Sequence, residues 1–303
     1  MMSEVLYNFA IIDAASEPEY FELFAQQDPL RSCLYEEPLD SDISKVAPYL
    51  IELTDDVKDW LDERTTPWGI YLSSEFPLIP LRQHLRQSLQ AQVPDDEKPQ
   101  LFRYYDPRII WLYIDAVPDL ERYHFLGPMN AIATHYGTER SENFDSLKAT
   151  FAKLPVDRHG PLKLSQPVYQ AIIDGCIQQM EQAVYVRLNQ TIEQNELDKP
   201  DESSNAVYTL RLNEDEPTDL VSSTRPTAEQ LSEFAKQLVR QLSYLGITQQ
   251  RLITGIAQLC AHHHYYRWEQ LPTDWMDRLC DENHRPLLNA QMLMIDHLGY
   301  VPA

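Results

Sequence analysis

The sequence has little glycine, with 8 residues in 303, and none of the glycine-rich motifs that cradle phosphates. Neither G-x-G-x-x-G nor G-x-x-x-x-G-K-[ST] occurs, which excludes the common dinucleotide and nucleoside triphosphate motifs. The hydrolase elbow G-x-S-x-G and the zinc-protease motif H-E-x-x-H are also missing. The sequence therefore predicts no cofactor and carries no standard signal for an enzyme.

Cysteine is scarce as well. The four cysteines, Cys33, Cys176, Cys260 and Cys280, lie far apart and form no C-x-x-C pair. This spacing indicates neither a zinc ribbon nor a disulfide framework, and we expect buried thiols.

Long apolar runs are missing too. No stretch approaches the roughly 18 consecutive apolar residues that a membrane-spanning helix requires. The first twenty residues contain a short apolar segment without the basic flank of a signal peptide. We therefore expect a cytoplasmic protein.

Basic residues are few relative to acidic ones, 25 against 47, for a net charge of −22. Nucleic acid and anionic membranes would be repelled, so neither is expected as the main partner. Most of the excess lies in residues 1–65, with 16 acidic and 4 basic groups, and in residues 193–220, with 9 and 2. Such blocks are typical of a solvated face and a loop, or they form a docking surface for a basic partner.

Strand and helix patterns alternate over about the first 132 residues. Apolar and β-branched content predicts the strands, and capping residues with helical spacing predict the helices. This alternation indicates an α/β lobe with a mixed or parallel sheet flanked by helices. The expected strands are 7–13, 47–53, 68–74 and 101–105, and the expected helices are 16–27, 54–63, 77–92 and one from Pro107.

The pattern becomes helical in the second half. A long helical pattern covers 164–194, and Thr227 with Gly246 gives residues 227–246 a start and a stop signal. We predict four regions, an α/β lobe (1–132), a helical extension (133–198), an acidic loop or linker (199–226) and an all-helical lobe (227–303).

Few residues suggest a metal site or acid catalysis. His262, His263 and His264 are consecutive, so on a helix they point about 100° apart and do not jointly face one ion. We therefore predict no metal site and interpret them as a helix end. Most paired carboxylates lie in turns or at helix starts, where capping explains them. Asp13 differs because it ends an apolar strand, and both a structural anchor and a catalytic acid remain open for it.

Four arginines stand out in the α/β lobe. Arg82 and Arg86 are one turn apart on a predicted helix, with His84 between them, and Arg103 and Arg108 flank a turn. Arginines from neighbouring elements can converge at one end of a sheet, where they suit carboxylate or carbonyl recognition. Alternatively, Arg103 and Arg108 form internal ion pairs with Asp106 or Asp13.

An ordered series of motifs resembles the type VI secretion adaptor or chaperone family, the Tap or TEC proteins. The series spans about residues 5–132, and "LKLSQPVYQAI" resembles the segment that often follows. Its members are YNFAIIDAA, CLYEEPL, VAPYLIEL, WGIYLSSEFPLIPLRQHLRQSL, LFRYYDPRIIWLYI and FLGPMNAI.

The resemblance implies a non-enzymatic role. Such adaptors bind a toxic effector in the cytoplasm and load it onto the secretion spike, either the tip protein VgrG or a PAAR cap. Trp68, Gly69, Arg103, Tyr105, Asp106, Pro107 and Arg108 match the family pattern. Together with the two arginines of the predicted helix, the expected partner-binding residues are Trp68, Arg82, Arg86, Arg103, Tyr105, Asp106 and Arg108.

Beyond residue 200 the resemblance ends, and we hypothesise that the helical lobe selects the effector. Two other functional classes stay open. One is an acidic immunity-type inhibitor that plugs a basic toxin. The other is an enzyme that uses Asp13, His84 or the histidines at 262–264.

Overall fold

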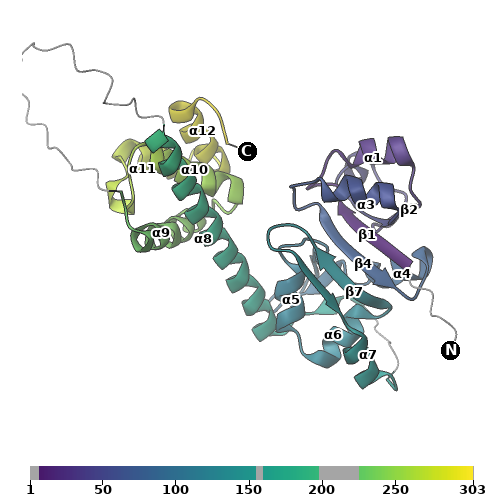
Figure 1. The fold of residues 1–303 in the computed structure, drawn as a ribbon. Coiled ribbons are helices and arrows are strands. Elements are labelled where there is room, and N and C mark those ends of the chain that lie inside the picture. Colours follow the sequence, from purple (N-terminus) through teal and green to yellow (C-terminus); the bar gives the residue numbers. More distant parts are fainter. Residues whose placement is uncertain (1–6, 155–159, 198–224, 303) are drawn as a thin grey trace, which may run out of the picture. The chain divides into compact units, whose positions relative to one another are not determined.

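The computed structural model of this chain describes residues 7–154, 160–197 and 225–302. The chain forms two compact units, Met1–Cys176 and Ile177–Ala303 (Figure 1). The boundary falls inside one long helix, α8 (Gln166–Leu197). The α/β lobe and the helical lobe predicted from the sequence are both confirmed.

The first unit is built on a six-stranded sheet in the order β2-β3-β1-β4-β7-β8, and every neighbouring pair in it is antiparallel. The strand at its centre, β1, pairs with β3 on one side and β4 on the other. In sheet order the bounds are β2 (Arg31–Cys33), β3 (Pro48–Glu52), β1 (Tyr7–Asp13), β4 (Gly69–Ser74), β7 (Met129–Thr134) and β8 (Arg140–Asn143).

The mixed or parallel pairing predicted for this sheet is therefore wrong, and the reason lies in the strand order. Strands β1 and β2 both pair antiparallel with β3, so they share one direction, as α-helical crossovers usually require. The third strand, β3, then inserts between them. In the same way β1 lies between β3 and β4. The connections from β1 to β2 and from β3 to β4 thus join strands that are not neighbours, and an antiparallel strand lies between the two strands of each pair.

Among the described strands, only those of a small second sheet include a parallel pair. Its order is β6-β5-β9, with β5 (Gln90–Gln92) antiparallel to β6 (Gln100–Leu101) and parallel to β9 (Leu162–Lys163). The predicted strand 101–105 shrinks to β6, because Phe102 and Arg103 are irregular and a turn begins at Tyr104. The following helix, α5, begins at Ile110 and not at Pro107.

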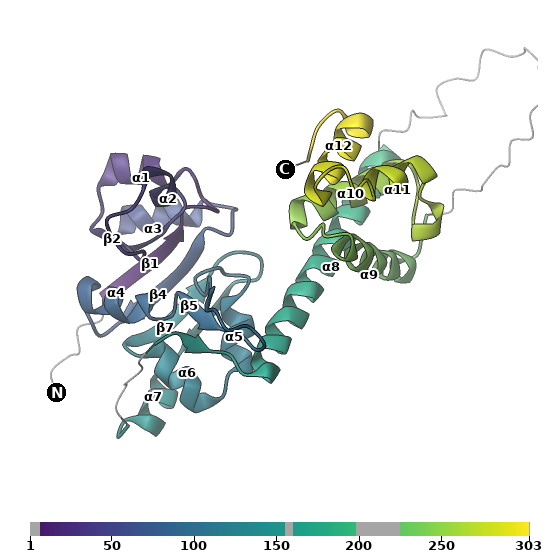
Figure 2. The same cartoon turned by 180° about the vertical axis from the view of Figure 1, so that it is seen from behind.

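Helices cover both faces of the main sheet (Figures 1 and 2). On β1, Ala10 and Ile12 belong to one core and Phe9 and Ile11 to another, which explains its continuous apolar run. The first core includes residues of α1 (Tyr20–Gln27) and α3 (Asp55–Asp62), and Thr54 caps α3 by accepting from the Val57 N–H. The second core includes residues of α4 (Leu78–Arg86), α5 (Ile110–Ala116) and α6 (Asp119–Leu126). Two short helices, α2 (Ser41–Ser44) and α7 (Asp145–Phe151), complete the unit.

The second unit is helical throughout its described residues. It contains the later part of α8 with α9 (Ala228–Tyr244), α10 (Gln250–His262), a 3-10 turn (Trp268–Gln270), α11 (Thr273–Leu279) and α12 (Pro286–Leu298). Helix α9 begins with a capping box, in which Thr227 and Gln230 each bond the other's backbone N–H, and Gly246 follows it at φ +81. Val184 and Leu188 of α8 join the apolar core of this unit.

One predicted region differs from the structure. The helical extension was expected to begin at residue 133, but the sheet continues through β7 and β8 to Asn143. Nearly all of the predicted acidic loop (199–226) lies outside the described residues. Among the described helices, none is long and apolar enough to cross a membrane.

Candidate partner-binding site

Arg103 lies beside Asp13, the residue that ends β1. Arg103 Nη2 donates to Asp13 Oδ2 and also lies 3.1 Å from the Ser16 hydroxyl. The carboxylate is buried, and it accepts two further bonds, from Ser16 Oγ at 2.9 Å and from the Ala15 N–H at 3.2 Å. Burial would lower the pKa of Arg103, but the charge and hydrogen bond of Asp13 outweigh it and raise the pKa. Asp13 thus has the geometry of an anchor.

Arg108 forms a two-pronged pair with Asp106 in the turn before α5. Its Nε lies 2.9 Å from Asp106 Oδ1 and its Nη2 lies 2.7 Å from Oδ2. The Arg108 N–H also donates to Oδ1, and the Asp106 carbonyl accepts from Ile109 and Ile110. Asp106 therefore organises the turn, but it is not the helix cap, since α5 begins later.

Arg82 and Arg86 share one face of α4 and reach the loop after β2. Arg82 Nε donates to the Cys33 carbonyl at 2.7 Å, whereas Arg86 approaches the exposed Glu36 only to 3.9 Å. His84, between them, lies 2.7 Å from the Phe125 carbonyl. Its ring fills the space beside Gly127, where a Cβ would lie 2.2 Å from it.

Trp68 and Tyr105 differ from what we expected of partner-binding residues, because both side chains are buried. Trp68 packs edge-on against Tyr71, with ring centroids 4.9 Å apart, and its carbonyl accepts from the Asp13 N–H at 2.7 Å. Burial, followed by the nearby Tyr35 and Asp13, raises the pKa of Tyr105. These two residues support the site from the core and do not lie on its surface.

The accessible part of the site is a group of arginines, which we call the arginine cluster (Arg82, Arg86, Arg103 and Arg108). The side chains of Arg86, Arg103 and Arg108 are 28%, 37% and 33% exposed, while the carboxylates of Asp13 and Asp106 lie buried beneath. Tyr35, in the loop after β2, lies close to Tyr105, in the loop that carries Arg103 and Arg108. Guanidinium groups held this way present fixed donors to a carboxylate or to backbone carbonyls.

The three consecutive histidines of the helical unit each contact a different residue. His262 Nδ1 lies 2.9 Å from Asn195 Oδ1, His263 packs edge-on against Trp275, and His264 lies near the Tyr266 hydroxyl. Within the part of the chain that the structure describes, no three histidine, cysteine or acidic side chains are grouped to hold a metal ion.

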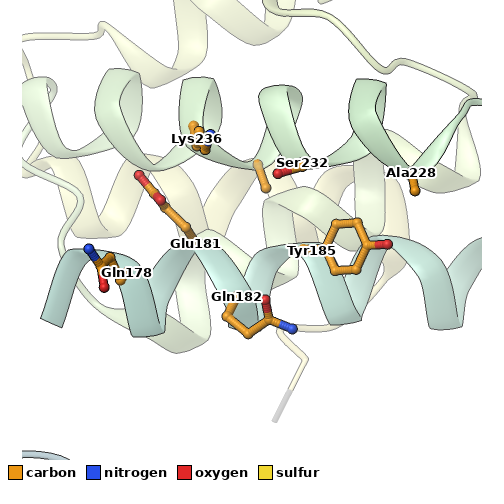
Figure 3. Close-up of a pocket in the computed structure, with 8 residues that line it drawn as sticks. Gln178, Glu181, Gln182, Tyr185, Ala228, Ser232 and Lys236 are labelled. Carbon is orange, nitrogen blue, oxygen red and sulfur yellow. The ribbon is translucent and has the colours of Figure 1, made fainter. Parts of the chain in front are cut away.

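A second candidate site is a groove of about 380 Å³ in the helical unit, between α8 and α9. Figure 3 shows Glu181 of α8 pointing toward Lys236 of α9, with the Tyr185 ring farther along the groove. No sequence pattern predicts this groove, because its residues come from two helices and are ordinary surface types. Six of its eight lining residues carry a polar group, and the full set is Gln178, Glu181, Gln182, Tyr185, Ala228, Ser232, Ala235 and Lys236.

Residues 8–123 match the model of a protein family described as a domain of unknown function, DUF4123. The match covers less than half of the 303-residue chain, but it contains the whole arginine cluster together with Trp68, Tyr105 and Asp106. Comparison with curated proteins and with solved structures gave no match.

Proposed function

We propose that this chain is a cytoplasmic adaptor that binds a type VI secretion effector and loads it onto the VgrG or PAAR protein of the secretion spike. The proposal draws on the DUF4123 match, because that domain is associated with type VI effector adaptors. It also draws on the ordered motifs between residues 5 and 132 that resemble this family.

The observation that carries the proposal is the arginine cluster over buried carboxylates. Asp13 and Asp106 hold the guanidinium groups of Arg103 and Arg108 in fixed positions, so little side-chain freedom is lost when a partner binds. About a third of each side chain stays exposed. In our proposal, this surface binds carboxylates or backbone carbonyls of a spike segment.

Binding and release of proteins then make up the whole activity, with neither a cofactor nor a catalytic step. The first unit takes the spike segment at the arginine cluster. The acidic surface of residues 1–65 and the helical unit, with its groove between α8 and α9, hold the effector. Apolar burial provides most of the affinity, while charge steers the partners together and selects between them.

Affinity capture tests this proposal. The tagged chain is purified from its native cytoplasm, and the co-purifying proteins are identified by mass spectrometry. We expect a VgrG or PAAR protein together with a toxic effector. Capture of neither would contradict an adaptor function.

Co-expression separates an adaptor from an immunity-type inhibitor, which the acidic charge of the chain would also suit. The captured effector is expressed in a sensitive strain with and without this chain. An inhibitor rescues growth. An adaptor leaves the toxin active, and its deletion from the producing strain reduces export of the effector.

A further inference from the structure

Three large apolar side chains are exposed on the first unit around the contact between α1 and α2. They are Phe21, Ile43 and Val46, which are 48%, 47% and 48% exposed, and we call them the α1–α2 patch. The Phe21 ring lies 3.9 Å from the ring of Tyr20, measured between centroids. The Tyr20 hydroxyl in turn donates to the Ser44 carbonyl at 3.2 Å, next to Ile43. Tyr20 therefore joins α1, which carries Phe21, to the segment that carries Ile43 and Val46.

The apolar core does not need these side chains. Tyr20, Leu23 and Phe24 are the residues of α1 that are buried against the sheet, whereas Phe21 faces outward. No residue of α2 is buried. Single exposed apolar residues are ordinary, but adjacent ones at the junction of two helices are typical of a contact surface.

Carboxylates outnumber basic side chains around the patch. All four basic side chains of residues 1–65 already pair with a carboxylate of the same region, as Arg31–Asp28, Lys45–Asp42, Lys58–Asp62 and Arg64–Glu19. Glu22 adjoins Phe21 on α1, and Asp40 caps α2, which carries Ile43. Both carboxylates are exposed, and neither has an ion pair within the described residues.

The exposed apolar side chains and the negative charge together distinguish between the partners that could bind the patch. A second copy of the chain would bring an equally acidic surface against this one and be repelled, and so would an anionic membrane. A segment with apolar side chains on one face and lysine or arginine on the other matches both features. We propose that the α1–α2 patch docks a basic amphipathic helix of a protein partner. This inference deepens the proposed function because it gives the chemistry of one partner, and it therefore rests on the proposed function.

Fluorescence anisotropy with a synthetic probe tests the inference on the full chain. The probe is a labelled helical peptide of about 18 residues with leucine on one face and lysine on the other, and its control has glutamate in place of every lysine. We expect the lysine peptide to bind and the glutamate peptide not to bind. Raising the salt from about 0.05 M to about 0.5 M should weaken binding, because the charges around the patch are exposed.

The variant Phe21→Ser/Ile43→Ser/Val46→Ser should bind the lysine peptide at least about tenfold more weakly. The matched control Phe76→Ser/Ile79→Ser/Ile295→Ser removes comparably exposed apolar side chains elsewhere and should bind as the unchanged protein does. Circular dichroism checks that both variants fold.

A charge-reversal variant keeps the inference testable if the serine variant does not fold. Glu22→Lys/Asp40→Asn should also weaken binding at least about fivefold, whereas Glu139→Lys/Glu282→Gln, with the same change in charge elsewhere, should not. Equal binding by either patch variant, or binding of the glutamate peptide, would overturn the inference. Dimerisation through the patch without peptide binding would overturn it in favour of self-association. Failed peptide binding alongside intact effector capture would overturn this inference alone and leave the adaptor function standing.

Discussion

Arg103 and Asp13 are 90 positions apart in the chain, yet the Arg103 guanidinium donates directly to the Asp13 carboxylate. The pair joins the end of the central strand β1 to the loop that carries the other charged residues of the candidate site. The pair also shows that the main role of Arg103 is structural. The side chain holds the fold together, and only its remaining exposed part is available to a partner.

Removing Arg103 should cost more stability than neutralising Asp13. Arg103→Ala leaves a buried carboxylate without its charge partner, which costs about 3 kcal/mol. Asp13→Asn leaves a partly exposed guanidinium that water can solvate and keeps an oxygen acceptor, so we expect about 1 kcal/mol. Native-state hydrogen exchange of the β1 amides measures both. Equal costs would show that the pair is not the structural anchor we describe.

Arg108→Glu should destabilise the first unit and leave little folded protein. The new carboxylate would lie against the buried carboxylate of Asp106, which would have lost a two-pronged partner, at a cost of about 3 kcal/mol or more. Urea denaturation followed by circular dichroism measures this cost. Arg108→Gln, which keeps a donor without the charge reversal, is the control and should cost less. If Arg108→Glu were as stable as the unchanged protein, the Arg108–Asp106 pair would have no structural role.

Gly69→Ala should prevent stable pairing of β1 with β4. Gly69 has φ +151, and a Cβ there would lie 1.8 Å from the Ile11 carbonyl oxygen, which belongs to the backbone of β1 and has no room to shift. We expect a loss of more than about 3 kcal/mol, seen as insoluble or unfolded protein. Gly137→Ala is the control, because Gly137 also has positive φ but open space around it, and should cost about 1 kcal/mol. Similar costs for the two variants would contradict the close approach.

Asp62 should make part of the stability depend on acid pH. Partial burial alone would raise the pKa of Asp62, but hydrogen bonds from Lys58 and Tyr71, with the nearby His135, outweigh it and lower the pKa below 3.8. The unfolded chain then takes up this proton more readily than the folded chain. The stabilisation is complete above the unfolded value and is lost as the pH falls through the folded one.

The variant Asp62→Asn should therefore unfold with a shallower dependence on pH between about pH 5 and pH 2 than the unchanged protein. Asp59→Asn, at an exposed position of the same helix, controls for the loss of one charge. Thermal unfolding across this range measures the difference. Identical acid profiles for all three proteins would refute the role given to Asp62.

Much of the fold could be predicted from local signals. Thr54 marks the start of α3, and Thr227 with Gly246 brackets α9, because caps and turns depend on neighbouring residues. The strand order could not be predicted. The insertion of β3 between β1 and β2 depends on contacts between distant segments, and the apolar run of β1 suits any strand with two buried faces.

The candidate site, too, could be predicted only in part from the sequence. The four arginines were found from their types and positions, and two of them have the ion pairs that we held as the alternative. The burial of Trp68 and Tyr105 could not be read from the sequence, since aromatic residues are common both in cores and at interfaces. The groove between α8 and α9 depends entirely on how two helices pack.

Charge reversal at Arg86 tests the central claim most directly, because this arginine is the least involved in holding the fold. Within the described residues it pairs only with the exposed Glu36, at 3.9 Å, so Arg86→Glu should change stability by less than about 0.5 kcal/mol. Arg240→Glu, an exposed arginine of the helical unit, is the matched control. The measurement is the affinity of each purified variant for the spike protein captured with the unchanged chain. We predict that folded Arg86→Glu binds it at least about tenfold more weakly while Arg240→Glu binds normally. Unchanged binding by Arg86→Glu would contradict a docking role for the arginine cluster.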